Sequence, residues 1–170
     1  IVRWVVIVSS ILGVVIAISQ IFTIGIFLLD VQYLYILMAF YLPLIFIIKQ
    51  SGLAWKHSFW LDVFLAVATF SICINLARLG NPIVLQGWEI GAPTYGVIQA
   101  FVLWALVLEG ARRSGGLLFA IVMLVFSLYP VYAGIMPAFL QGYAMPLRTI
   151  ACYHAFSLVS IVGLPMKVFG

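Results

Sequence analysis

The sequence has very little charge. Only 7% of its 170 residues are Asp, Glu, Lys or Arg, whereas soluble domains carry about a quarter. Hydrophobic residues make up 66% of the chain. A chain of this length cannot bury so large an apolar fraction in one water-soluble core, so lipid has to be the solvent for most of it. The composition therefore argues against a soluble enzyme and predicts an all-α, polytopic membrane protein.

The sequence also has few residues that carry chemistry. Its two cysteines, Cys73 and Cys152, lie far apart without a CxxC pair, which predicts neither a disulfide framework nor a zinc site. No GxSxG, HExxH or glycine-rich phosphate loop occurs, so neither a membrane hydrolase nor a nucleotide-driven pump is indicated. The eight basic residues are scattered between apolar runs, which speaks against nucleic-acid binding. We expect no enzyme activity, no catalytic residue, and no metal or cofactor bound by these residues.

Long apolar runs are what the sequence does have. A membrane-spanning helix needs about 20 apolar residues, and we predict five spans and a sixth, weaker one. The predicted spans are 4–24, 32–48, 59–76, 93–108, 117–135 and 150–166. Pro130 is expected to kink the fifth. The sixth is short and contains His154, so it either crosses the membrane or lies along its surface.

The stretch VLEGARRSGG, residues 107–116, follows the fourth span. Glu109 precedes Arg112 and Arg113 by three and four residues, the spacing at which helical side chains pair. Gly115 and Gly116 allow the chain to turn back. We interpret the three charged residues as a structural anchor at a cytoplasmic helix end.

Basic residues predict the orientation of the spans. With a cytoplasmic N-terminus, six of the eight basic residues lie inside, and only Arg78 and Arg148 lie outside. This asymmetry follows the positive-inside rule. The N-terminus is therefore expected in the cytoplasm.

Few polar residues in the apolar runs are candidates for a substrate or ion site. Asp62 lies near the start of the third span, close to Lys56 and His57, and Arg148 lies near the predicted outer surface. We rank both as weak candidates. His57 and His154 are the only histidines. Because a b-type haem needs two facing imidazoles, a membrane-anchor subunit of a redox complex is the alternative function.

Four motifs resemble a known family. They are WLDVFLA (60–66), LWALVLEGARRSGG (103–116), FSLYPVYAGIMPAFL (126–140) and VGLPMKV (162–168). In this order they resemble the N-terminal, small-subunit-like part of the fused permease of tripartite ATP-independent periplasmic (TRAP) transporters, of the type served by TAXI-class binding proteins. Val159 and Ser160 stand where that family carries a glutamate-glycine pair.

The resemblance implies a division of the chain and a function. Residues 1–135 would be scaffold helices and residues 136–170 the start of a large transport domain that continues beyond this sequence. The complete protein would lie in a bacterial or archaeal cytoplasmic (inner) membrane. It would import organic acids by symport, driven by an ion gradient, with sodium the expected ion. Its partners would be the lipid bilayer, an extracytoplasmic substrate-binding protein and the rest of the transport domain. Because broken helices and midplane charges are rare before residue 135, we expect this piece to bind neither sodium nor a dicarboxylate.

Two matters stay open at this level. An assembly or interaction protein without a transport role is a further possibility. The transported substrate, the stoichiometry of the coupling ion and the oligomeric state cannot be read from these residues.

Overall fold

The computed structural model describes residues 2–21, 28–48, 58–137 and 139–157. Within these ranges the chain is helical, with no strand. The described residues form two compact units, the first ending at Asn81 and the second starting at Pro82. The all-α fold predicted from composition is thereby confirmed. The two units are described separately below.

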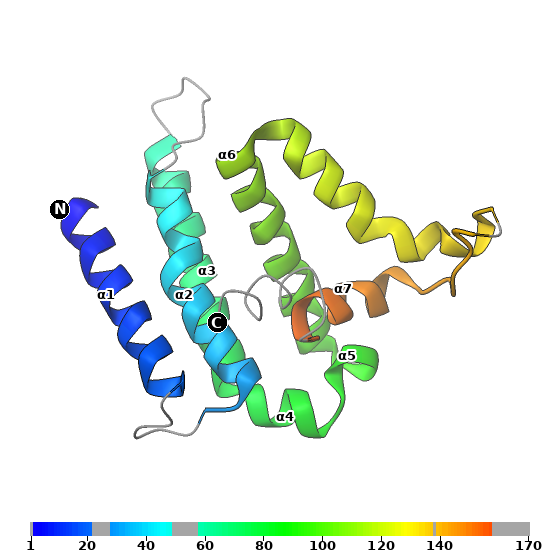
Figure 1. The fold of residues 1–170 in the computed structure, drawn as a ribbon, viewed down its shortest axis with the longest axis horizontal. Helices are drawn as coiled ribbons and strands as arrows, with labels where there is room; N and C mark the ends of the chain where they lie inside the picture. Colours follow the sequence, from blue (N-terminus) through cyan, green and yellow to red (C-terminus); the bar gives the residue numbers. More distant parts are fainter. Residues whose placement is uncertain (1, 22–27, 49–57, 138, 158–170) are drawn as a thin grey trace. The chain divides into compact units, whose positions relative to one another are not determined.

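The first unit contains three helices. They are α1 (Val2–Ile21), α2 (Asp30–Ile48) and α3 (Ser58–Arg78). Helix α2 packs against both α1 and α3 (Figure 1). At Gly13 of α1, an added Cβ would lie 2.3 Å from Oη of Tyr41 on α2, so a small residue is needed for this close approach.

The second unit contains the remaining helices. They are most of α4 (Gly80–Leu85), then α5 (Trp88–Gly91), α6 (Thr94–Tyr132), the 3₁₀ turn η1 (Ala133–Ile135) and α7 (Leu147–Phe156). Helix α7 packs against α5 and α6. Trp88 of α5 is fully buried, and its ring meets the rings of Tyr95 and Phe156 edge-on.

Helix α6 bends sharply within its 39 residues. A straight helix of this length would measure about 60 Å, twice the hydrocarbon thickness of a bilayer. Gly116 interrupts it with φ 85° and ψ 174°, a conformation open essentially to glycine alone. Figure 1 shows the two resulting arms leaving this bend in different directions. We call residues 94–115 the first arm, 117–132 the second arm and 109–116 the elbow.

The two arms correspond to the predicted fourth and fifth spans. The chain turns at the predicted glycine pair, but the helix continues to that pair instead of ending at residue 108. The helix also runs through Pro130 to Tyr132, and its non-helical dihedral angles occur at Gly116, not at the proline.

Three described helices are long and apolar enough to cross a membrane: Asp30–Ile48, Phe59–Arg78 and Thr94–Ile135. The apolar stretch in α1, Val6–Gln20, is shorter. Helix α7 has 10 residues, about 15 Å of helix, which is half of what a span needs. The described part of the predicted sixth segment therefore does not form a span, and residues 158–166 lie outside the description.

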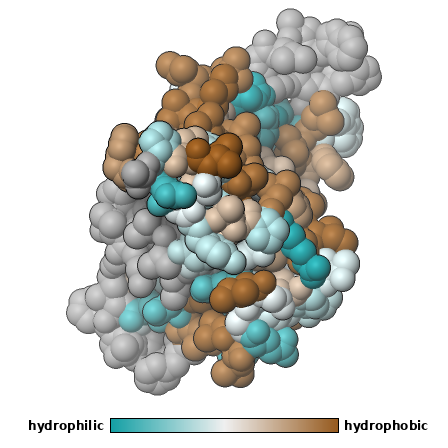
Figure 2. Space-filling view, turned by 90° about the vertical axis from the view of Figure 1, so that its right-hand side faces the viewer, coloured by the Kyte–Doolittle hydropathy of each residue, from teal (hydrophilic) through white to brown (hydrophobic). Residues whose placement is uncertain are grey.

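Large apolar side chains are exposed on these helices. Trp60 on α3 is 74% exposed and Leu118 on α6 is 76% exposed. Figure 2 shows apolar side chains at several places on the face in view, beside polar ones. Exposed apolar area on this scale is unusual for a soluble monomer and suits contact with lipid.

Candidate functional site

The elbow of α6 carries the ion-paired cluster that the sequence predicts. Arg112 donates from Nε and Nη2 to the two carboxylate oxygens of Glu109, each at 2.7 Å, and Arg113 Nε lies 2.8 Å from Glu109 Oε1. The two-pronged contact of Arg112 is the stronger geometry for a guanidinium and a carboxylate. The three residues therefore form one unit at the end of the first arm.

The two arginines differ in their surroundings. The side chain of Arg113 is 4% exposed, whereas that of Arg112 is 36% exposed. Ser114 completes the turn by donating from Oγ to the carbonyl oxygen of Gly110 at 2.9 Å. One arginine is thus held inside the protein while the other reaches its surface, as expected at a boundary between apolar and polar surroundings.

Beyond the second arm, the chain folds back on α6. We call residues 127–154 the C-terminal hairpin. Tyr129 Oη donates to the carbonyl of Leu140. Two backbone bonds follow, from Gly142 N to Ala133 O and from Met145 N to Pro130 O, both at 3.0 Å. The chain between η1 and α7 is largely non-helical, so these bonds supply partners for backbone groups that no helix satisfies.

His154 of α7 contacts both arms of α6. Its Nε2 lies 2.9 Å from the carbonyl oxygen of Ser127 on the second arm. Because a carbonyl only accepts, Nε2 carries the proton and donates. Its ring stacks on Trp104 of the first arm, with 6.0 Å between ring centroids and 29° between ring planes. At 6% exposure, this histidine links the two arms from inside the unit.

Pro130 lies three residues after Ser127 in the second arm. Proline has no N–H, so the helix bond to the carbonyl four residues earlier, that of Phe126, is missing. The carbonyl of Ser127, the next residue along the chain, accepts from the imidazole of His154. A side chain thus bonds to the backbone close to a proline, as is common in membrane helices.

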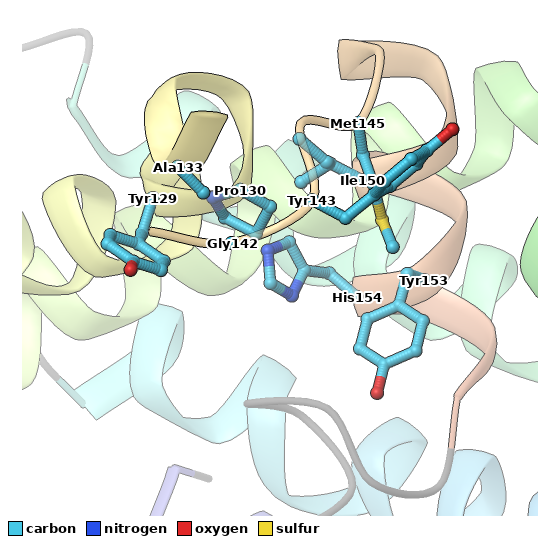
Figure 3. A pocket seen from close by; sticks show the side chains of 9 residues that line it. All are labelled: Tyr129, Pro130, Ala133, Gly142, Tyr143, Met145, Ile150, Tyr153 and His154. Atoms are coloured by element: carbon cyan, nitrogen blue, oxygen red, sulfur yellow. The ribbon is translucent and has the colours of Figure 1, made fainter. Parts of the chain in front are cut away.

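The C-terminal hairpin lines an open cavity of about 350 Å³. Figure 3 shows its nine lining residues, with the imidazole of His154 directed toward Pro130 and Gly142. The lining residues are Tyr129, Pro130, Ala133, Gly142, Tyr143, Met145, Ile150, Tyr153 and His154.

Arg148, a weak candidate for ligand binding, has a structural contact. Its Nη2 donates to the carbonyl oxygen of Ala92 at 3.1 Å, the residue that ends α5. A cation at a helix C-terminus is a favourable arrangement. Burial raises the pKa of the nearby Cys152 thiol, although Arg148 opposes this shift, so the thiol stays protonated at neutral pH.

Asp62, the other weak candidate, lies in the first unit. It is near the start of α3 and 5% exposed. Among the described residues, no group of three His, Cys, Asp or Glu side chains is arranged to hold a metal ion. His57 lies outside the described residues, so the pair of histidines considered for a haem cannot be placed.

Sequence reasoning missed the C-terminal hairpin as a site. Its glycines and prolines between Gly134 and Pro146 indicate broken helix, and His154 in an apolar segment indicates a buried polar contact. The pairing of Ser127 with His154 has no such signal, because it is made by a backbone carbonyl that every residue possesses. Comparison with family models, with curated proteins and with solved structures finds no significant match.

Proposed function

We propose that the chain is the membrane scaffold portion of a secondary, ion-gradient-driven, binding-protein-dependent importer of organic acids, similar to TRAP transporters. The observation that carries the proposal is the position of the α6 elbow. The ion-paired cluster and the Gly116 bend fall within the sequence motif 103–116 on which the resemblance chiefly rests.

The arrangement after the elbow supports the same proposal. The third motif, 126–140, covers the end of the second arm and the start of the non-helical chain. In a fused permease this is where scaffold helices give way to the transport domain. We propose that residues 1–135 form the scaffold, that residues 1–170 contribute five to six spans, and that the N-terminus is cytoplasmic.

A scaffold needs span-length helices fixed at one depth in the membrane. Three such helices are present in the described residues, and the charged elbow anchors the bend of the longest at the polar boundary. Sodium and substrate would bind in the remaining transport domain, on broken helices of the kind that secondary transporters use.

Cysteine labelling in intact cells tests the orientation. In a background with Cys73 and Cys152 replaced by Ala, Ser114→Cys at the elbow should resist an impermeant maleimide. Leu85→Cys, at a position 84% exposed on α4, should react. Labelling of Ser114→Cys but not Leu85→Cys would overturn the proposed orientation.

Uptake by the complete transporter tests the function. The double variant Glu109→Gln, Arg113→Gln should lower sodium-driven uptake of an organic acid such as 2-oxoglutarate while expression stays normal. The matched control is Arg78→Gln, which removes a charge at the C-terminal end of α3, on the outer side in the proposed orientation. Unchanged uptake in the double variant would reject a role for the elbow, and haem absorption by the purified protein would favour the redox-anchor alternative instead.

A further inference from the structure

The cavity in the C-terminal hairpin is lined by both buried and exposed residues. Its deep wall is formed by Ile150, Ala133 and His154, which are 1%, 2% and 6% exposed. Its rim is formed by Tyr143 and Met145, which are 84% and 36% exposed. This gradient describes a pocket with a floor and a mouth, so a molecule can enter it without unfolding the hairpin.

The lining determines the charge of an occupant. Among the described residues around the cavity there is no Asp, Glu, Lys or Arg, so an ionic ligand would lose its hydration without gaining a counter-charge. The imidazole proton on Nε2 is already donated to the Ser127 carbonyl. An uncharged molecule is the one that this lining accommodates.

The shape and chemistry of the walls favour a flat ring. Aromatic side chains of Tyr129, Tyr143 and Tyr153 stand around the cavity with the thioether of Met145 (Figure 3), and both groups contact aromatic rings favourably. The volume of about 350 Å³ falls within the usual range of ligand pockets, about 300 to 1,000 Å³. Smaller apolar cavities, of about 150 Å³, stay dry and bind benzene.

We propose that this cavity is a binding site for an uncharged, ring-shaped apolar molecule. The bound ring would contact the second arm through Tyr129 and Pro130 and the returning chain through Met145 and His154. It would therefore hold the two sides of the hairpin together. This inference does not depend on the proposed transport function.

Fluorescence quenching provides a direct test. Trp104 stacks on His154, so a bromine atom in the cavity should quench its emission. The probe is 4-bromophenol at neutral pH, added to the purified protein in detergent. We expect saturable quenching that disappears in Trp104→Phe, together with slower maleimide labelling of Cys152 on α7. Quenching that only rises linearly with probe concentration, or labelling that does not change, would overturn the site.

Rim variants separate the cavity from general partition into detergent. Met145→Phe narrows the mouth and should weaken binding by about tenfold. Leu147→Phe places the same ring at a position 44% exposed outside the lining and should leave binding unchanged. If Met145→Phe does not fold, Tyr143→Ala, which removes a rim ring at a highly exposed position, should weaken binding severalfold. Equal binding by each folded rim variant and Leu147→Phe would reject the cavity as the site.

Two further probes test the ligand class. Binding of 4-bromobenzoate, which is anionic, should be much weaker than binding of 4-bromophenol. Binding of 1-bromohexane, a straight chain, should also be weaker. Equal binding of the benzoate would contradict the requirement for an uncharged molecule, and tighter binding of the hexane would show that the cavity accepts a lipid chain and not a ring.

Discussion

The two arms of α6 belong to one helix but are held in different ways. The first arm buries a stripe of small and aliphatic residues at helical spacing: Gly96, Val97, Ala100, Leu103, Leu106, Gly110 and Ala111. Among the described residues of the second arm, Ser127 alone is buried. Hydrogen bonds with the returning chain hold the second arm and the η1 turn that follows it.

The difference shows what specifies packing in a chain with so little polarity. In lipid, an aliphatic face has no hydrophobic reason to prefer another helix over the membrane, so close packing of small residues and hydrogen bonds decide. At Gly96, an added Cβ would lie 3.1 Å from the ring of Trp88, and this closeness fixes α5 on the first arm. The second arm lacks such a stripe and depends on its polar partners.

The largest effect should come from removing the aromatic packing on the first arm. Trp88→Ala leaves a cavity where α5, α6 and α7 meet. Loss of a buried tryptophan lowers the free energy of unfolding by about 3 to 5 kcal/mol. Because Trp88 contacts Phe156 of α7, α7 should open more often. Maleimide labelling of Cys152, which is 1% exposed, should accelerate by about a hundredfold or more.

Two controls belong to this experiment. Cys73, also buried but in the first unit, should keep its labelling rate. Ile90→Ala, on the same short helix at a position 82% exposed, should leave both rates unchanged. Equal acceleration of Cys73 and Cys152 would mean that the whole protein has unfolded, and no acceleration would contradict the role of Trp88.

His154→Phe should weaken the link between the arms. Phenylalanine keeps the ring against Trp104 but leaves the Ser127 carbonyl without its donor, and a buried polar group that loses its partner costs about 1 to 3 kcal/mol. Labelling of Cys152 should rise by about tenfold. Tyr153→Phe is the matched control, because that hydroxyl points away from His154 (Figure 3). A rise in the control alone would contradict the link.

Gly116→Ala should strain the elbow. An alanine held at φ 85° costs about 1 to 3 kcal/mol, and the alternative is a straighter helix with the arms displaced. Spin labels at Ile98 and Val122, both exposed, would report the angle between the arms. Ser114→Ala, two residues earlier in regular helix, should leave the distance between the labels as it is. An unchanged distance and melting temperature in Gly116→Ala would show that the bend does not need glycine.

The sequence predicted the helical elements better than their contacts. Apolar runs located α2, α3 and the second arm of α6 to within a few residues, and the start of the first arm, which ends seven residues later than predicted. Long apolar runs indicate such helices whatever they pack against. The pairing of Glu109 with Arg112 and Arg113 followed from their spacing alone, since helical geometry brings side chains three and four residues apart together. The C-terminal hairpin did not follow, because its bonds join backbone groups of residues far apart in sequence, such as Met145 and Pro130. The predicted boundary at residues 135 and 136 stays a prediction.

The smallest effect on stability is expected from Glu109→Gln at the elbow. Arg112 is partly solvated, and surface ion pairs of this kind contribute about 0 to 1 kcal/mol. Glutamine also keeps an oxygen that accepts a bond from either arginine. We therefore expect the melting temperature in detergent and the labelling of Cys152 to stay close to those of the unaltered protein.

Glu109→Leu gives the comparison that makes this small effect informative. Leucine removes the carboxylate that accepts from Arg113, whose side chain is 4% exposed. Loss of an acceptor lowers stability far more for a buried charge than for a solvated one. The Leu variant should therefore melt at a lower temperature than the Gln variant. If both variants melt together with the unaltered protein, the cluster contributes nothing to folding, and its arginines serve the membrane surface alone. If the Gln variant is as unstable as the Leu variant, the negative charge itself is required, and the elbow is held by electrostatics and not by hydrogen-bond geometry.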